Sequence, residues 1–131
     1  MYTVKYINFW NNNGDIQDRW LTTFIEKNLH IKLIETQNNN ETPDIVISSC
    51  FGNLDYINKY KNVRCKIFFY GENLNRYPNF SNFEKLYDIF DLIIGFKYTD
   101  KEKKIYRLPL WMTYYPFYNM NTDANILNYI Q

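Results

Sequence analysis

The chain has 131 residues, of which 46% are hydrophobic, 22% charged and 20% aromatic. This length suits a single domain, and the high aromatic content excludes an intrinsically disordered chain. A formal charge of +1 at pH 7 argues against electrostatic recruitment to nucleic acid or to an anionic membrane.

The sequence shows no sign of a membrane anchor, an export signal or a metal site. Its apolar runs fall short of the roughly 20 residues that a membrane-spanning helix requires. Residues 1–14 lack the regions of a signal peptide, so we expect a soluble, intracellular protein. His30, Cys50 and Cys65 do not have metal-ligand spacing, and we expect one structural histidine and two buried free cysteines.

The first part of the chain predicts strands on either side of one long helix. Residues 4–10 are rich in β-branched and aromatic side chains, which favours a strand, and an Asn-rich turn follows them. From Asp15 to Leu29 apolar residues recur at intervals of three and four, as in an amphipathic helix. Residues 31–34 predict a short strand, and the polar residues 37–42 predict a loop.

The second part predicts a repeated alternation of strand and short helix. Four strands are expected from short apolar runs between turn residues, at residues 44–49, 66–70, 91–96 and 105–111. The first of these has the pattern of a strand that is buried on both faces, and Pro109 keeps the last one near a sheet edge. Short helices are expected around residues 54–60 and 83–90.

This alternation predicts an α/β protein with a Rossmann-like, open, mainly parallel sheet and flanking helices. We expect a single domain over residues 1–118, followed by a linker or short helix over residues 119–131.

In such a sheet, ligands bind beyond the carboxyl ends of the strands, and Glu72 directly follows a strongly apolar strand. Gly71 permits a sharp turn before it. A carboxylate partly desolvated by nearby aromatic side chains would have a raised pKa and could act as a general base. The alternative is that Glu72 caps a loop or pairs with a lysine.

Four segments of the chain carry a resemblance to a known family. They are Lys66-Ile-Phe-Phe-Tyr-Gly-Glu-Asn73, Pro78-Asn-Phe80, Phe90-Asp-Leu-Ile-Ile-Gly-Phe96 and Arg107-Leu-Pro-Leu110. In this order they resemble bacterial α-1,3/4-fucosyltransferases of glycosyltransferase family 10, which have the two-domain GT-B architecture. Each segment is short, but the four together are fairly specific. The match lies in the amino-terminal, acceptor-binding half, although residues 81–89 are extra and Lys97 stands where an acidic residue is common.

The resemblance implies that Glu72 is the general base. It would take the proton from a hydroxyl of a glycan acceptor, such as N-acetylglucosamine, as that oxygen attacks GDP-fucose with inversion of configuration. Asn73 would orient the turn or the acceptor. Arg107 would position a ligand, or instead form an ion pair with Asp88 or Asp91.

Aromatic side chains near these segments could bind a sugar ring by stacking. Tyr70, Tyr77, Phe80 and Trp111 are the candidates, because the CH faces of sugars pack on aromatic rings. Aromatic residues are so abundant in this chain that most of them must belong to the core, which is the alternative for each of the four.

The resemblance also implies that the part of the enzyme that binds the donor is missing from this chain. In this family the GDP-fucose site belongs to a carboxy-terminal domain, and we expect no donor-binding domain and no cofactor here. Activity would then need a separate donor-domain polypeptide. The alternatives are a non-catalytic glycan-binding or interaction module, a remnant of a truncated gene, or an unrelated flavodoxin-like domain.

Overall fold

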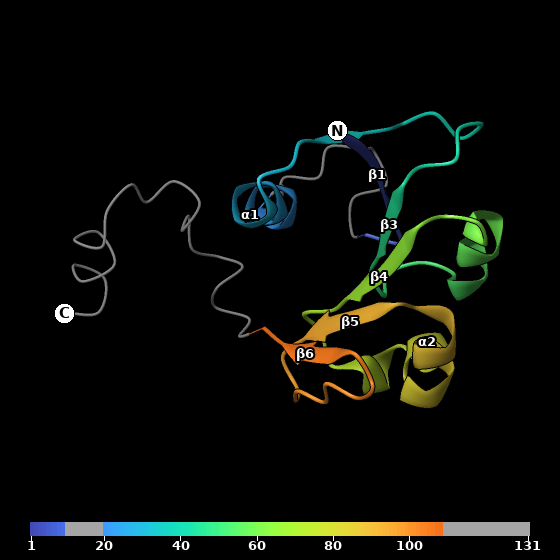
Figure 1. Ribbon diagram of the computed structural model, residues 1–131. Coiled ribbons are helices and arrows are strands. Elements are labelled where there is room, and N and C mark those ends of the chain that lie inside the picture. The colour runs from blue at the N-terminus through green and yellow to red at the C-terminus, as the bar shows by residue number, and fades with distance from the viewer. Residues whose placement is uncertain (10–19, 109–131) are drawn as a thin grey trace, which may run out of the picture.

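The computed structural model describes residues 1–9 and 20–108, which form one open sheet with helices on both sides (Figure 1). The strands occur in the order β2-β1-β3-β4-β5-β6, and all five pairings are parallel. Their bounds are β1 (Tyr2–Ile7), β2 (Leu33–Glu35), β3 (Ile45–Ser48), β4 (Cys65–Phe69), β5 (Leu92–Gly95) and β6 (Ile105–Arg107). The predicted α/β class and parallel sheet are confirmed.

Within the described residues, two α-helices and three short 3-10 helices connect the strands. They are α1 (Trp20–Leu29), η1 (Leu54–Tyr60), η2 (Leu74–Arg76), η3 (Pro78–Phe80) and α2 (Phe83–Ile89). Asparagine side chains cap several of them: the Oδ1 atom of Asn53 accepts from the N–H of Asp55 at 2.9 Å, and that of Asn82 from the N–H of Lys85 at 3.3 Å. None of the helices within these ranges is long and apolar enough to cross a bilayer.

The handedness of the crossovers distributes the helices between the two faces. The connection from β1 to β2 runs toward one edge of the sheet, whereas every later step from β3 to β6 runs toward the other edge. Right-handed crossovers in opposite directions lie on opposite faces. Accordingly, α1 lies on one side of the sheet in Figure 1, and α2 lies on the other. We call the first side the α1 face and the second the α2 face.

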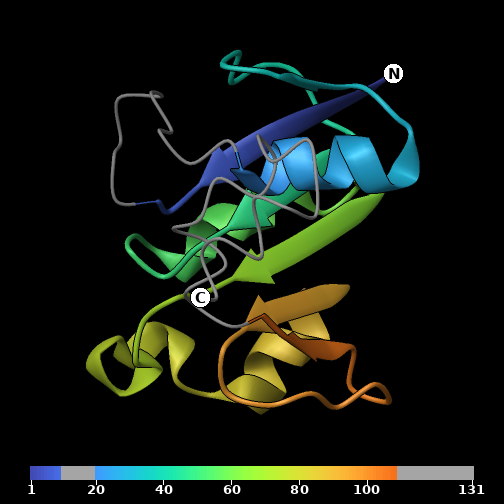
Figure 2. The same ribbon diagram turned by 90° about the vertical axis from the view of Figure 1, so that its left-hand side faces the viewer.

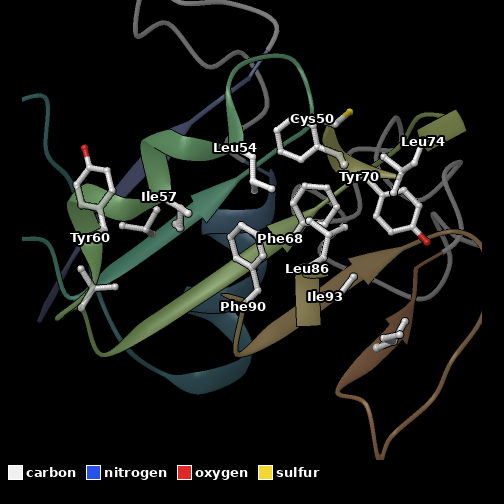
Figure 3. Packing of buried hydrophobic residues seen from close by; sticks show 14 residues of the cluster. Cys50, Leu54, Ile57, Tyr60, Phe68, Tyr70, Leu74, Leu86, Phe90 and Ile93 are labelled. Carbon is white, nitrogen blue, oxygen red and sulfur yellow. The ribbon is translucent and has the colours of Figure 1, made fainter. Parts of the chain in front are cut away.

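The larger part of the core lies between the sheet and the helices on its α2 face. Phe68 of β4 is fully buried in its middle, where its ring stacks on Phe80 at 5.6 Å and contacts Phe90 at 5.3 Å between ring centroids. Leu86 of α2 is also fully buried and lies close to these rings (Figure 3). Close packing of this kind holds η1, η2, η3 and α2 in fixed positions against the strands.

The element boundaries differ in places from the predicted ones. The strand expected at residues 31–34 begins only at Leu33, because α1 ends at Leu29 and His30 adopts a left-handed conformation with φ of 53°. His30 is exposed, as is typical of a residue in such a turn. Of the two cysteines, Cys50 is buried as expected and Cys65 is partly exposed. Predictions for residues 10–19 and 109–131 lie outside the described residues.

Candidate functional site

The carboxyl ends of β1 and β3 lie side by side at the point where the chain reverses its direction across the sheet. From β1 the chain continues to β2 on one side, and from β3 it continues to β4 on the other. The two connecting segments therefore diverge at this edge, which is the usual ligand-binding position in open α/β sheets. The loop after β4, with Glu72, leaves the same edge one strand further along.

Asn8, directly after β1, fixes the loop that follows β3. Its Nδ2 atom donates to Ser48 Oγ at 3.1 Å and to the carbonyl oxygen of Asn53 at 3.0 Å. Its own carbonyl accepts from the N–H of Phe51 at 2.9 Å. Asn8 is buried and has a φ of 58°, a conformation that asparagine tolerates better than most residues. The loop of residues 49–53 is thus held at both ends by one side chain.

Glu72 lies in the turn between β4 and η2, and its side chain is exposed to solvent. The structure confirms that it follows a central, buried strand at the carboxyl edge of the sheet. The desolvation expected from neighbouring aromatic residues is not present. No lysine or arginine within the described ranges forms an ion pair with Glu72, so the alternative of a lysine pair finds no support there.

Two ionisable groups lie within electrostatic reach of the Glu72 carboxylate. Burial raises the pKa of the Cys50 thiol to about 11, and the negative charge of Glu72 contributes to this rise. The pKa of Tyr77 is also raised, mainly by partial burial, with smaller contributions from Cys50 and Glu72. The ring of Tyr77 packs edge-on against Phe51 at 5.5 Å between centroids. The loop after β3, the turn after β4 and the end of η2 therefore meet around Glu72.

Asn73 caps the amino end of η2. Its Oδ1 atom accepts from the N–H of Asn75 at 3.1 Å, and its carbonyl accepts from the N–H of Arg76 at 3.0 Å. It is the N-cap of η2 and is exposed. This cap stabilises the start of η2, which follows the turn that carries Glu72.

Tyr70 does not offer the open ring face that sugar stacking requires. It is only 2% exposed and packs against Phe68, Phe83 and Phe96 at 5.6–5.8 Å between centroids. Burial raises the pKa of its hydroxyl, which the backbone of Lys97 partly offsets. That hydroxyl nevertheless makes no hydrogen bond of good geometry among the described residues.

Of the other proposed stacking residues, Phe80 also belongs to the core at 1% exposure, and Trp111 lies outside the described residues. The structure therefore replaces the predicted stacking surface with core packing for Tyr70 and Phe80. Among the candidates within the described residues, Tyr77 alone keeps a partly exposed ring close to Glu72.

Arg107 ends β6, two strands away from β4, and is exposed. Its N–H donates to Thr99 Oγ1 at 2.8 Å. No ion pair joins it to Asp88 or Asp91, so the structural alternative foreseen for this arginine is not observed. Two strand spacings correspond to roughly 10 Å between the ends of β4 and β6 along the carboxyl edge.

The sequence model of the alpha-(1,3)-fucosyltransferase FucT N-terminal domain matches residues 4–114, most of the chain. The chain belongs to this family. The match covers β2 to β6, all but the first two residues of β1, and each of the four segments that carried the resemblance. No curated protein sequence matches the chain.

Two solved structures share the fold of this family member. One is a crystal structure of an alpha1,3-fucosyltransferase, with a TM-score of 0.54 and 23% identity, and the other is an alpha1,3-fucosyltransferase with GDP, with a TM-score of 0.50 and 22% identity. Both similarities cover 82% of this chain but only 28% and 26% of the solved chains. The chain therefore spans about a quarter of the length of these proteins.

Sequence reasoning did not identify Asn8 or Phe51 as part of the site of this FucT N-terminal domain. A signal was present: Asn8 follows an apolar strand, and asparagine there suits a residue that leaves the strand in a left-handed conformation. The contact with the loop after β3 could not be read from sequence, because it joins residues 40 and 45 positions apart.

Proposed function

We propose that this chain is the acceptor-binding part of a fucosyltransferase and that Glu72 is the general base of an inverting transfer. The single observation that supports this most is the family match, together with the position of Glu72 at the carboxyl edge of the sheet. Glu72 is exposed, so a sugar hydroxyl can reach it from solvent.

In the proposed step, a hydroxyl of an acceptor such as N-acetylglucosamine gives its proton to the Glu72 carboxylate. The acceptor oxygen forms a bond to the anomeric carbon of fucose on the face opposite the leaving group. The bond from that carbon to the phosphate oxygen breaks, and GDP leaves with the electron pair. A positioned base of this kind contributes typically about 10²–10⁴-fold to the rate.

The surrounding residues would bind the acceptor. The exposed side chains of Asn73 and Arg107 supply donors for sugar hydroxyl groups. Tyr77 takes over the stacking role that sequence reasoning had shared with Tyr70, since its ring is the partly exposed one beside Glu72. The Asn8 hydrogen bonds hold Phe51 against Tyr77 and so fix the wall of the site.

Donor binding is assigned to a region outside these 131 residues, in the same polypeptide or in another one. A general base lowers the barrier little unless the developing charge on the diphosphate is also stabilised. We assign the exposed basic side chain of Arg107 to the acceptor.

Titration followed by amide NMR tests whether this chain binds the acceptor and not the donor. We expect N-acetyllactosamine to shift the signals of residues 49–53 and 71–77, and GDP-fucose to shift none of them. Binding of GDP-fucose to this chain at micromolar concentration would contradict the assignment. The Arg107→Gln substitution should weaken acceptor binding. The control is Arg64→Gln, which lies at the amino end of β4, away from the carboxyl edge, and should leave acceptor binding unchanged.

A further inference from the structure

Among the described residues, a helix covers only one half of the α1 face of the sheet. α1 packs over β1, β2 and β3 through Leu21, which is buried beside Val4, Leu33 and Ile47. In Figure 2, which looks onto this face, α1 crosses in front of β1 and β3, and no described helix lies in front of β5 and β6. This second half of the α1 face carries apolar side chains.

Four residues define this region, which we call the β5–β6 patch: Leu92, Ile94, Tyr106 and Leu108. Leu92, Ile94 and Leu108 belong to the core cluster of the α1 face but are only partly buried, and Tyr106 is 41% exposed. Ile94 and Tyr106 are direct partners in the register of β5 and β6. The patch is thus a continuous apolar surface formed by two neighbouring strands.

Right-handed topology excludes the connections between β3 and β6 as a cover for the patch. All crossovers from β3 to β6 run in one direction, and right-handed connections in that direction lie on the α2 face. The contacts agree: the loop before β6 packs on α2, with Lys97 over the ring of Phe83 and Lys103 paired with Glu84 at 3.5 Å. Parallel sheets are normally covered on both faces. The connection from β1 to β2 lies on the α1 face but runs toward the opposite edge of the sheet, so we look for a cover in the chain after β6 or in another molecule.

The path of the chain at the end of β6 favours the following segment of the same chain as the cover of the patch. The N–H of Leu108 donates to the carbonyl of Gly95 at 2.6 Å, so the chain remains paired with β5 up to this residue and leaves the sheet with Leu108 on the α1 face. The sequence that follows, Pro-Leu-Trp-Met-Thr-Tyr-Tyr-Pro-Phe-Tyr, carries no charge, and the first charged residue after Arg107 is Asp123. Such a segment has the composition of a core element and not of a solvent-exposed linker.

We propose that residues 109–118 dock on the β5–β6 patch and complete the α1 face of the sheet. The occupant is this segment of the same chain, with its aromatic side chains against Ile94 and Tyr106. A second copy of the chain and a separate domain are the competing occupants. The proposal is independent of the transferase function, because it concerns a sheet face and not the carboxyl edge where Glu72 lies.

NMR on the unmutated chain tests the contact directly. With isoleucine and leucine methyl groups labelled, we expect nuclear Overhauser contacts from Ile94 and Leu92 to aromatic protons of residues 111–118. These contacts should persist on dilution and should be absent between differently labelled copies in a mixed sample. Contacts found only between copies, or none at all from these methyl groups, would overturn the proposal.

Fluorescence of Trp111 gives a second test, in a chain that carries Trp10→Phe and Trp20→Phe. We expect emission that is blue-shifted relative to the urea-unfolded chain, and a red shift on addition of Ile94→Lys. The matched control is Ile34→Lys, because Ile34 is an exposed isoleucine on β2 at the far edge of the sheet. It should leave the emission unchanged. If the folded chain with Trp10→Phe and Trp20→Phe had the same emission as the unfolded chain, this result would contradict the docking.

Discussion

The side chain of Asn8 occupies the space in which a side chain at position 52 would begin. A Cβ atom added to Gly52 would lie 2.2 Å from Asn8 Oδ1 and 3.2 Å from Asn8 Cβ. Asn8 cannot easily move away, because it is buried and its Nδ2 atom bonds to Ser48 and Asn53. The glycine and the asparagine together set the path of the loop that forms one wall of the candidate site.

Gly52→Ala should destabilise the protein by about 1–3 kcal/mol, since the new methyl group must displace a hydrogen-bonded side chain. In an Asn8→Gly background the same substitution should cost at least about 1 kcal/mol less, because the obstructing atoms are gone. Urea unfolding of the two single variants and the double variant measures this coupling. An equal cost of Gly52→Ala in both backgrounds would contradict the steric explanation.

Tyr70→Phe should leave the free energy of unfolding unchanged or raise it by about 1 kcal/mol, because the buried hydroxyl makes no hydrogen bond of good geometry among the described residues. The matched control is Tyr6→Phe, which removes a hydroxyl that is hydrogen-bonded to Thr22 Oγ1. That substitution should cost about 1 kcal/mol. A larger loss for Tyr70→Phe than for Tyr6→Phe in urea unfolding would show that the Tyr70 hydroxyl has a partner after all.

Gly95→Ala should also destabilise the protein, by about 1–3 kcal/mol or more. An added Cβ atom would lie 2.0 Å from the ring of Tyr70, which is enclosed by other aromatic rings. Replacement of Tyr70 by leucine in the same chain should recover part of the loss. Thermal unfolding of the two variants measures this, and an unaffected melting temperature for Gly95→Ala would argue against the close ring contact.

Asp44 should make part of the stability depend on pH. The N–H of Thr3 donates to its carboxylate at 2.9 Å, and this bond, with the Thr3 hydroxyl and the Arg64 guanidinium, holds the pKa of Asp44 below its usual value of 3.8. Because the pKa is lower in the folded state, the contribution is fully present above the pKa of the unfolded chain. It is lost as the pH falls through the lower, folded value.

The comparison of Asp44→Asn with the unmutated chain tests the direction of this pH dependence of stability. The asparagine variant should be less stable at pH 7, and the difference should shrink as the pH falls below about 4, where the unfolded carboxyl group takes up a proton. Chemical unfolding at several pH values gives the two curves. A difference that stays constant down to pH values of about 2 would contradict the proposed hydrogen bonding of the charged form.

Much of the sheet could be predicted from sequence, because buried parallel strands are short apolar runs with turn residues at both ends. Residues 44–49 and 66–70 have this pattern, and they correspond to the central strands β3 and β4. The position of Glu72 at the carboxyl edge followed from the strand before it. The 3-10 geometry of η1 could not be predicted, since Leu54, Ile57 and Tyr60 also fit an α-helix.

The candidate site was harder to predict than the sheet, because it depends on which side chains are enclosed. Tyr70 and Tyr77 lie seven residues apart in the same aromatic stretch, yet one is 2% exposed and the other is partly exposed. This difference arises from α2 and the loop after β5, which bring Phe83 and Phe96 against Tyr70. Local sequence carries no information about these distant contacts.

The most direct test of the account is a transfer assay that compares two isosteric variants. The chain is combined with a donor-domain polypeptide of a family 10 fucosyltransferase, GDP-fucose and N-acetyllactosamine. Glu72→Gln removes the proposed base, and Glu102→Gln is the matched control, because Glu102 is an exposed glutamate in the loop that leads to the amino end of β6.

We predict that Glu72→Gln lowers the transfer rate by at least about 100-fold, as expected for loss of a general base, while acceptor binding and stability are kept. Glu102→Gln should transfer fucose at the rate of the unmutated chain. Transfer by the unmutated chain that does not exceed transfer by Glu72→Gln would contradict the central claim.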